Sequence, residues 1–190
     1  MHAEIDKWIR LLWVGFIVLW ISAALVQKRT VRRESVASRL SYVSVAVAAV
    51  LLMAYPRLSV GLLSRSFVPA TLSYAFFGLG LTIAGFAFAI WARVHLGRNW
   101  SGTVTIKKDH ELIRGGPYGI VRHPIYTGAL LALLGTSIIF GETRWLLGFG
   151  LAVLALRLKS LREERFMTEQ FGAEYADYRR KVKALIPFFW

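Results

Sequence analysis

Apolar residues in this chain occur in long blocks, and short charged or polar segments separate the blocks. Five blocks cover residues 8–26, 40–55, 70–92, 124–140 and 145–158. A helix needs about 20 apolar residues to cross the roughly 30 Å hydrocarbon core of a bilayer. The five blocks reach or approach that length, although the last two are short for a span. The pattern therefore predicts an all-α fold, that of a polytopic membrane protein with about five transmembrane helices.

The composition supports a membrane protein. Hydrophobic residues make up 56% of the 190 residues, whereas a typical soluble domain has about 45–50%. Basic residues follow the first block, and no small-residue cleavage site does, so we expect a retained span rather than a signal peptide. The chain has no cysteine, which excludes disulfides, thiolate catalysis and cysteine-bound metals.

The formal net charge of +13 is concentrated between the apolar blocks. Of the 24 basic residues, 19 lie within residues 27–39, within residues 93–123 or from residue 157 onward. Charges placed next to spans indicate contact with anionic membrane lipids rather than nucleic acid. By the positive-inside rule, residues 93–123 and the C-terminal tail are cytoplasmic and the N-terminus lies outside, which an odd number of spans satisfies.

We expect a single integral-membrane domain over residues 1–190, with scaffold spans in residues 1–95 and the chemistry in residues 96–190. Three glycines of the third block, Gly78, Gly80 and Gly85, either allow close helix packing or reflect the frequency of glycine in membrane helices.

Two segments of the second half are predicted to lie outside the membrane. Residues 96–118 are rich in polar residues and glycine, which predicts a loop with a turn at Gly115-Gly116-Pro117. After the fifth block, apolar residues recur every three or four positions, at Met167, Phe171, Tyr175, Tyr178 and Val182. This spacing predicts one face of an amphipathic helix that lies on the cytoplasmic surface or folds over the loop.

Arg122, His123 and Pro124 stand at the start of the fourth block. Proline is favourable in the first turn of a helix, so we expect the helix to begin at Pro124. A helix N-terminus attracts anions, and the neighbouring arginine and histidine strengthen a site for a carboxylate. Tyr118 and Tyr126 flank the run, and their rings can pack against a flat ligand or a cation. Interfacial anchoring is the alternative, but anchoring does not require a histidine before proline.

Glu163 and Glu164 lie near the end of the fifth block. A charge in the middle of a membrane costs about 2.5–3.5 kcal/mol on insertion scales, and the cost is smaller at the boundary. Lys159 precedes Glu163 by one helical turn, so an ion pair explains part of the pattern. Glu163 can also present its carboxylate to a cationic ligand. With the anion-binding helix start, this predicts a cytoplasmic site for a zwitterion.

Two segments, GGPYGIVRHPIYTG and REERFMTEQFGAEYADYRRKVKALIP, resemble the isoprenylcysteine carboxyl methyltransferase family. They also resemble the broader group of small membrane methyltransferases that includes phospholipid N-methyltransferases. The resemblance covers about half the chain, from about residue 96 to residue 187. It implies a multi-pass membrane methyltransferase that uses S-adenosyl-L-methionine, an amino-acid zwitterion with an added sulfonium.

The resemblance also implies a set of site residues. The expected cofactor contacts are His110, Leu112 and Ile113 in the loop, then Tyr118, His123, Pro124, Ile125, Tyr126 and Glu163. The family commonly has an acceptor-facing arginine where this chain has Lys159, and lysine keeps the charge but loses the bidentate fork. The predicted catalytic set is Lys159 with Arg157 and Arg122.

The acceptor stays open at this point. We expect a lipophilic small molecule or a lipidated acceptor with a carboxylate, such as an isoprenylcysteine-type α-carboxyl. A phospholipid or other lipid amine is the alternative. An NADPH-dependent membrane sterol-type reductase and a non-catalytic membrane protein are further alternatives. A metal is not expected, because the four histidines show no metal-binding spacing.

Overall fold

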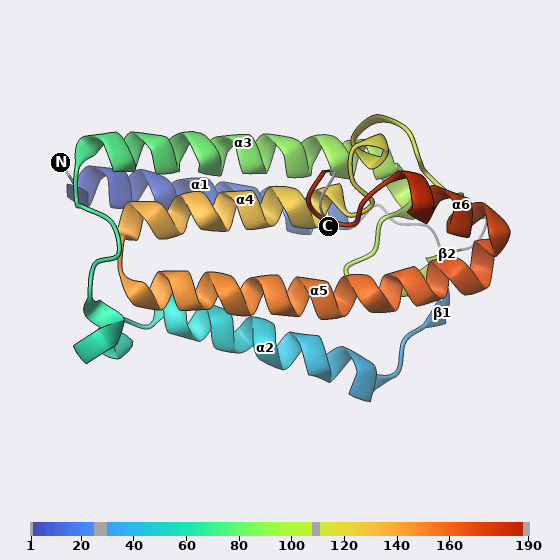
Figure 1. The fold of residues 1–190 in the computed structure, drawn as a ribbon, viewed down its shortest axis with the longest axis horizontal. Coiled ribbons are helices and arrows are strands. Elements are labelled where there is room, and N and C mark those ends of the chain that lie inside the picture. Colours follow the sequence, from blue (N-terminus) through green and yellow to red (C-terminus); the bar gives the residue numbers. More distant parts are fainter. Residues whose placement is uncertain (1, 25–29, 108–110, 188–190) are drawn as a thin grey trace.

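The computed structural model describes residues 2–24, 30–107 and 111–187, and most of these are helical (Figure 1). The long helices are α1 (His2–Ala24), α2 (Val36–Ala54), α3 (Leu72–Leu96), α4 (Pro124–Phe140) and α5 (Thr143–Phe171), and a short helix α6 (Ala173–Lys181) follows. Single-turn 3-10 helices occupy Pro56–Leu58, Gly61–Ser64, Gly97–Asn99 and Gly116–Gly119. Each predicted apolar block thus corresponds to one long helix.

Two short strands, β1 (Thr30–Arg33) and β2 (Thr105–Lys107), form an antiparallel ribbon. This ribbon departs from the all-α prediction. Its strands have only four and three residues, too few for an alternating pattern to reveal. The ribbon joins the α1–α2 connection to the loop that follows α3.

By length and composition, two helices in the described part of the chain can cross a membrane, Val36–Ala54 and Leu72–Asn99. The helix Pro124–Phe140 is apolar but shorter. The count of five spans remains a prediction.

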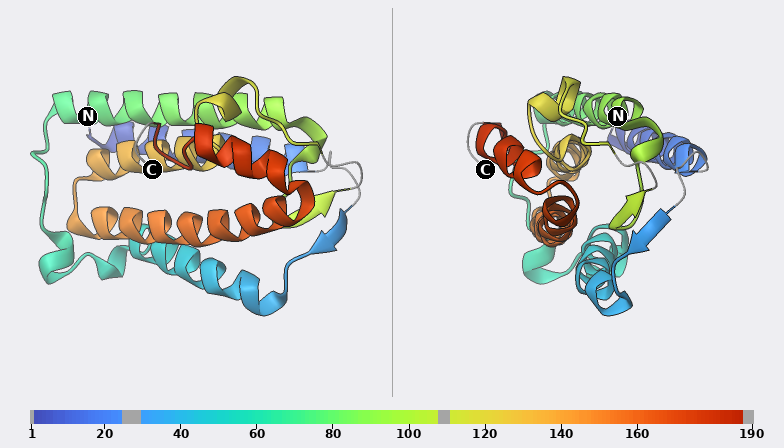
Figure 2. Two further views of the ribbon diagram at one scale, coloured as in Figure 1. Left: turned by 45° about the vertical axis from the view of Figure 1, so that its right-hand side comes forward. Right: turned by 90° about the vertical axis from the view of Figure 1, so that its right-hand side faces the viewer.

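The long helices lie side by side along the long axis of the molecule (Figures 1 and 2). In these views α4 and α5 lie between α3 on one side and α2 on the other. The β1–β2 ribbon, the loop after α3 and α6 gather at one end of the bundle. The polar segments of the second half therefore share one end with the ribbon.

Helices α3 and α4 pack backbone against backbone through glycine. A methyl group added at Gly85 would lie 2.5 Å from the carbonyl oxygen of Gly128, and one at Gly78 would lie 2.5 Å from that of Gly135. Contact this close excludes a side chain and is typical of helix packing in membranes. Gly80, in contrast, faces open space. The packing interpretation is therefore confirmed for Gly78 and Gly85 but is wrong for Gly80.

Helix α1 is fixed against this pair of helices by one polar and one aromatic contact. The indole Nε1 of Trp13 donates a hydrogen bond of 3.0 Å to Thr136 Oγ1 on α4. The ring of Phe16 stacks on Phe86 of α3, with ring centres 4.3 Å apart. These contacts hold the aromatic side of α1 against α3 and α4.

The amphipathic helix predicted after the fifth block is divided in two. Helix α5 continues to Phe171, and Gly172 then adopts a φ of 51°, which favours glycine. The turn directs α6 over the loop, where Tyr175 and Tyr178 are buried. The hydroxyl of Tyr178 donates a 2.6 Å hydrogen bond to the carbonyl oxygen of Tyr118. Folding over the loop is therefore the observed arrangement.

Candidate active site

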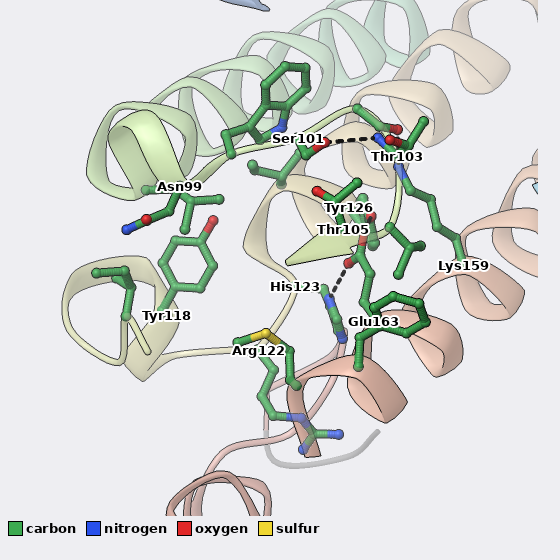
Figure 3. A pocket seen from close by; sticks show the side chains of 18 of the residues that line it. Asn99, Ser101, Thr103, Thr105, Tyr118, Arg122, His123, Tyr126, Lys159 and Glu163 are labelled. Carbon is green, nitrogen blue, oxygen red and sulfur yellow. Dashed lines mark hydrogen bonds and ion pairs between the residues drawn. The ribbon is translucent and has the colours of Figure 1, made fainter. Parts of the chain in front are cut away.

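A cavity of about 480 Å³ lies at the end of the bundle where the loop, α5 and α6 meet (Figure 3). Small-molecule sites usually have about 300–1,000 Å³. The cavity brings together nine of the residues expected from the sequence, namely Leu112, Ile113, Tyr118, Arg122, His123, Ile125, Tyr126, Lys159 and Glu163. The expected site is thus contiguous in space, although its members come from separate parts of the chain.

Glu163 presents its carboxylate at the cavity and is held from the start of α4. The hydroxyl of Tyr126 donates a 2.5 Å hydrogen bond to Glu163 Oε1, and His123 Nδ1 lies 3.4 Å from Oε2 (Figure 3). Burial by itself raises the pKa of Glu163, but the contact with His123 and the charge of Lys159 outweigh it and lower the pKa. Glu163 is therefore an ionised carboxylate beside a cavity.

Glu164 turns away from the cavity and is 4% exposed. Arg122 donates two hydrogen bonds to Glu164 Oε1, from Nη2 at 2.5 Å and from Nε at 3.1 Å. His123 Nε2 lies 3.2 Å from Oε1, and Arg179 Nε lies 3.4 Å from Oε2. We name these four residues the Glu164 clamp. Burial raises the pKa of Glu164, but His123 and Arg122 outweigh it and lower the pKa to about 2.

Arg122 and His123 of the clamp also form hydrogen bonds with the segment that follows α6. Arg122 Nη1 donates to the carbonyl oxygens of Arg179 and Val182. The backbone N–H groups of Arg122 and His123 donate to the carbonyl oxygens of Lys183 and Ala184. The sequence predicted that this helix start binds an anion of a ligand, whereas in the structure the carboxylate beside Arg122 is that of the chain's own Glu164. A direct role of Arg122 at the acceptor stays a prediction.

His123 links the two carboxylates. Its ring is 9% exposed, and its Nδ1 and Nε2 face Glu163 and Glu164 respectively. Burial disfavours the charged ring, but the contacts with both carboxylates outweigh burial and raise the pKa of His123. A protonated imidazole donates from both nitrogens, so it can hold both carboxylates at once.

Lys159 reaches the cavity from α5 and binds the segment that follows α3. Its Nζ donates a 2.9 Å hydrogen bond to Gly102 O and lies 5.3 Å from the centre of the Tyr126 ring. The hydrogen bond of its ammonium therefore goes to the backbone rather than to Glu163. Among the other expected residues, Pro124 is buried at the start of α4, and neither it nor Arg157 is among the cavity-lining residues. His110 lies outside the described residues.

The segment after α3 supplies part of the wall that the sequence analysis missed. Asn99 and Thr105 line the cavity, and each is 9% exposed. Among the described residues, Asn99 Oδ1 and Thr105 Oγ1 have no hydrogen-bond partner. A buried polar atom without a partner costs about 1–3 kcal/mol. The polar run directly after the third apolar block was the available signal.

Two residues outside the cavity wall hold this segment in place. Arg93 Nη1 donates to Gly97 O at 2.8 Å, and its guanidinium lies 4.6 Å from the centre of the Trp100 ring. Glu34, directly after β1, accepts from Val104 N at 3.2 Å through its side chain and donates to Val104 O through its backbone. The wall is thus fixed from α3 and from the ribbon.

The apolar side of the cavity comes partly from α1, which the sequence analysis assigned to the scaffold. Phe16 and Trp20 line the cavity, and Trp20 contacts Trp100 edge-to-face at 5.5 Å. Their spacing of four residues puts both rings on one helix face. In the described ranges no cluster of three or more histidine or acidic residues is placed to hold a metal ion.

Comparison with known proteins decides the family. Residues 73–174, more than half of the chain, match the sequence model described as phospholipid methyltransferase. The chain belongs to the phospholipid methyltransferase family. The matched residues run from α3 to the start of α6. They include three members of the Glu164 clamp, Arg122, His123 and Glu164, together with most of the cavity wall.

Individual relatives agree with this family. The chain is 35% identical to the protein-S-isoprenylcysteine O-methyltransferase of Schizosaccharomyces pombe over 112 residues, 57% of this chain and 48% of the relative. It is 46% identical to methanethiol S-methyltransferase 2 of Bradyrhizobium diazoefficiens over 71 residues, 37% of this chain and 26% of the relative. The chain spans about half the length of the isoprenylcysteine methyltransferases it matches.

A solved structure extends the similarity to the fold. It is that of a eukaryotic intramembrane Ras methyltransferase, an isoprenylcysteine carboxyl methyltransferase, with a TM-score of 0.54 and 26% identity. The match covers 78% of this chain and 52% of the other. The resemblance expected from the two sequence segments is thereby confirmed.

Proposed function

We propose that this chain is an integral-membrane methyltransferase that moves a methyl group from S-adenosyl-L-methionine to a lipophilic carboxylate, such as an isoprenylcysteine-type α-carboxyl. One observation carries the proposal. A single cavity contains the ionised Glu163, the ammonium of Lys159 and an aromatic wall from α1, in a chain of the phospholipid methyltransferase family.

The residues of the cavity fit the cofactor. Glu163 suits its ammonium group, because a charge-assisted hydrogen bond to a carboxylate is among the strong ones. When bound, the cofactor supplies a methyl group on a sulfonium, which is a good leaving group. His123 and Tyr126 would hold Glu163 in place while it binds.

Lys159 supports a carboxylate acceptor over an amine. Its ammonium group lines the same cavity as Glu163, and a cation attracts a carboxylate but repels a protonated amine. An ammonium has three donors, and Gly102 O takes one of them, so donors remain for an acceptor. A carboxylate is already ionised at pH 7, whereas an amine must first lose a proton to a base.

The main contribution of the chain to the reaction is alignment. Methyl transfer is an in-line displacement, and correct placement of two reactants is worth about 7–11 kcal/mol. The Glu164 clamp fixes the start of α4 on α5, and thereby sets where Tyr126 and Glu163 stand. Phe16 and Trp20 form an apolar wall that keeps water away from the reacting groups.

A radioactive-methyl assay tests the acceptor class. Membranes of the host are incubated with the protein and S-adenosyl-L-methionine that carries a labelled methyl group. A carboxyl methyl ester releases labelled methanol in base, whereas a methylated amine keeps its label. We expect base-labile label, and base-stable label would favour a lipid amine, the alternative acceptor.

We also propose five spans, with the N-terminus outside and the cavity on the cytoplasmic side. The support is the count of 19 of the 24 basic residues in three segments on one predicted side. Reporter fusions after Val26, Tyr55 and Ala92 should lie inside, outside and inside. An even number of spans would contradict the proposal, because the N-terminus and the C-terminal tail would then lie on the same side.

A further inference from the structure

Lys159, the residue that we propose binds the acceptor, is held at the cavity by contacts with three segments of the chain. Its Nζ donates a 2.9 Å hydrogen bond to Gly102 O, on the cavity-lining segment after α3. The same nitrogen lies 5.3 Å from the centre of the Tyr126 ring on α4 and 5.9 Å from that of the Tyr42 ring on α2. Figure 3 shows the Lys159 side chain extending towards Thr103, the neighbour of Gly102. Because lysine has a flexible four-carbon stem, these contacts decide where its charge stands.

Two of these contacts lead back to Glu34, which directly follows β1. Glu34 Oε1 accepts hydrogen bonds from the hydroxyl of Tyr42 and from the backbone N–H of Val104. The backbone N–H of Glu34 donates to Val104 O at 3.1 Å. Val104 lies two residues after Gly102 and is 1% exposed. One carboxylate therefore fixes both the ring beside the ammonium of Lys159 and the backbone that accepts from it.

The start of α2 is also fixed on α5, close to Lys159. Arg162, three residues after Lys159, donates from Nη1 to Ser38 Oγ at 2.6 Å and from Nη2 to Ser41 Oγ at 2.8 Å. Ser38 Oγ in turn donates a 3.0 Å hydrogen bond to Glu34 Oε2. Both carboxylate oxygens of Glu34 are thus engaged by the chain itself, which favours a role in positioning over direct contact with a ligand.

We propose that Glu34 is a positioning residue for methyl transfer, because it places the ammonium of Lys159 where the acceptor carboxylate binds. It acts through the Tyr42 ring and through the backbone of residues 102–104. The inference rests on the proposed function, in which Lys159 binds that carboxylate. Methyl transfer depends on the alignment of its reactants, so a displaced ammonium lowers turnover. The donor is held by Glu163 instead, so donor affinity should change little.

The test measures methyl transfer and donor binding on the same variants. Transfer is the initial rate at which host membranes gain base-labile label from S-adenosyl-L-methionine with a labelled methyl group, and donor binding is followed by calorimetry with S-adenosylhomocysteine. Glu34→Ala should lower the rate about 5-fold and leave the Kd of S-adenosylhomocysteine within about 2-fold. Glu34→Gln should restore the rate, because the Tyr42 and Val104 contacts both go to Oε1, which glutamine keeps as an acceptor.

A double-mutant cycle separates positioning from general loosening of the fold. In the Lys159→Met background the ammonium is absent, so adding Glu34→Ala should lower the rate by less than about 2-fold more. If Glu34 only stabilised the fold, both backgrounds would lose the same factor. Tyr42→Leu removes the ring beside Lys159, so it should lower the rate about 3-fold and should also be non-additive with Lys159→Met.

Glu169→Gln is the matched control for the ribbon. Glu169 Oε2 accepts a 2.6 Å hydrogen bond from Arg32 Nη1 and thereby ties β1 to α5, and both side chains are more than half exposed. An exposed ion pair contributes little, so the rate should stay within about 2-fold of wild type.

A wild-type rate in Glu34→Ala, or the same loss with and without Lys159, would overturn the inference. A loss that Glu34→Gln does not restore would overturn it as well. If Glu34→Ala does not fold, the cycle of Tyr42→Leu with Lys159→Met decides, and additive losses there contradict the inference. A wild-type chain that yields no base-labile label would overturn the proposed carboxylate acceptor together with this inference, whereas label that is insensitive to Glu34 overturns the inference alone.

Discussion

Glu163 and Glu164 are neighbours on α5, yet they belong to two different regions of the molecule. Glu163 borders the cavity, where Tyr126 and His123 hold its carboxylate and its side chain is 24% exposed. Glu164 lies in the clamp, where Arg122, His123 and Arg179 surround its carboxylate and it is 4% exposed. Successive residues of a helix point about 100° apart, which is enough to place the two carboxylates on different faces.

The comparison teaches how one helix turn can serve two purposes. A buried carboxylate needs several donors, and the clamp provides them from two segments of the chain, Arg122-His123 and α6. This arrangement joins α5, the start of α4 and the end of α6 at one point. The cavity carboxylate then has a fixed position while part of it stays accessible to a ligand. His123 belongs to both regions, because each of its nitrogens faces one carboxylate.

The largest effect is expected from Glu164→Gln, and it should be an effect on stability. Breaking a buried ion pair by removing one partner costs about 3–5 kcal/mol, because Arg122 is left buried without its counter-charge. The unfolding temperature in detergent should therefore fall strongly for Glu164→Gln and much less for Glu163→Gln. Equal unfolding temperatures of wild type and Glu164→Gln would remove the structural role assigned to the clamp.

A smaller effect is expected from Lys159→Met, and it concerns turnover. Methionine keeps the length of the side chain but removes the ammonium charge that we propose binds the acceptor. With a carboxylate acceptor, methyl transfer should fall about 10-fold while S-adenosylhomocysteine affinity stays near the wild-type value. A parallel loss of donor affinity would show instead that Lys159 supports Glu163. Unchanged donor binding together with unchanged turnover would contradict the role assigned to Lys159.

The pH dependence of stability should also distinguish the two regions. The pKa of Glu164 is lowered to about 2, so the clamp stabilises the fold above the ordinary pKa of 4.5, and this stability is lost as the pH falls towards 2. The pKa of His123 is raised, so its contribution is complete below its ordinary value of 6.5 and is lost as the pH rises through the raised pKa.

Unfolding measured from pH 2 to pH 9 for wild type and Glu164→Gln checks this expectation. The difference between the two should shrink between pH 4.5 and pH 2, where the wild-type carboxyl takes up its proton. A difference that stays constant over this range would mean that the charge of Glu164 is not what stabilises the clamp.

Much of the fold was predictable because it depends on local sequence. The apolar blocks gave the five long helices, and Pro124 gave the start of α4, since proline fits the first turn. The break at Gly172 was missed because the apolar spacing from Met167 to Val182 continues across it. Only a positive φ, set by how α6 packs on the loop, divides that face into two helices.

The site was predictable where a motif carried it and unpredictable where long-range contacts build it. The two sequence segments pointed to Glu163, His123 and Tyr126, which the fold brings together. The wall formed by Asn99 and by Trp20 depends on how α1 and the loop after α3 meet, and no local pattern encodes that contact. For the same reason, the sequence did not show that Glu164 supplies the anion for Arg122.

The central claim is that Glu163 binds the methyl donor and Glu164 does not. Isothermal titration of the detergent-solubilised chain with S-adenosylhomocysteine, and separately with NADPH, tests it at a temperature where all variants are folded. The account predicts binding of S-adenosylhomocysteine but not NADPH, a Kd raised about 10- to 150-fold by Glu163→Gln, and a change of less than about 3-fold in Glu164→Gln. Binding by Glu163→Gln that equals wild type, or tight binding of NADPH instead, would contradict it.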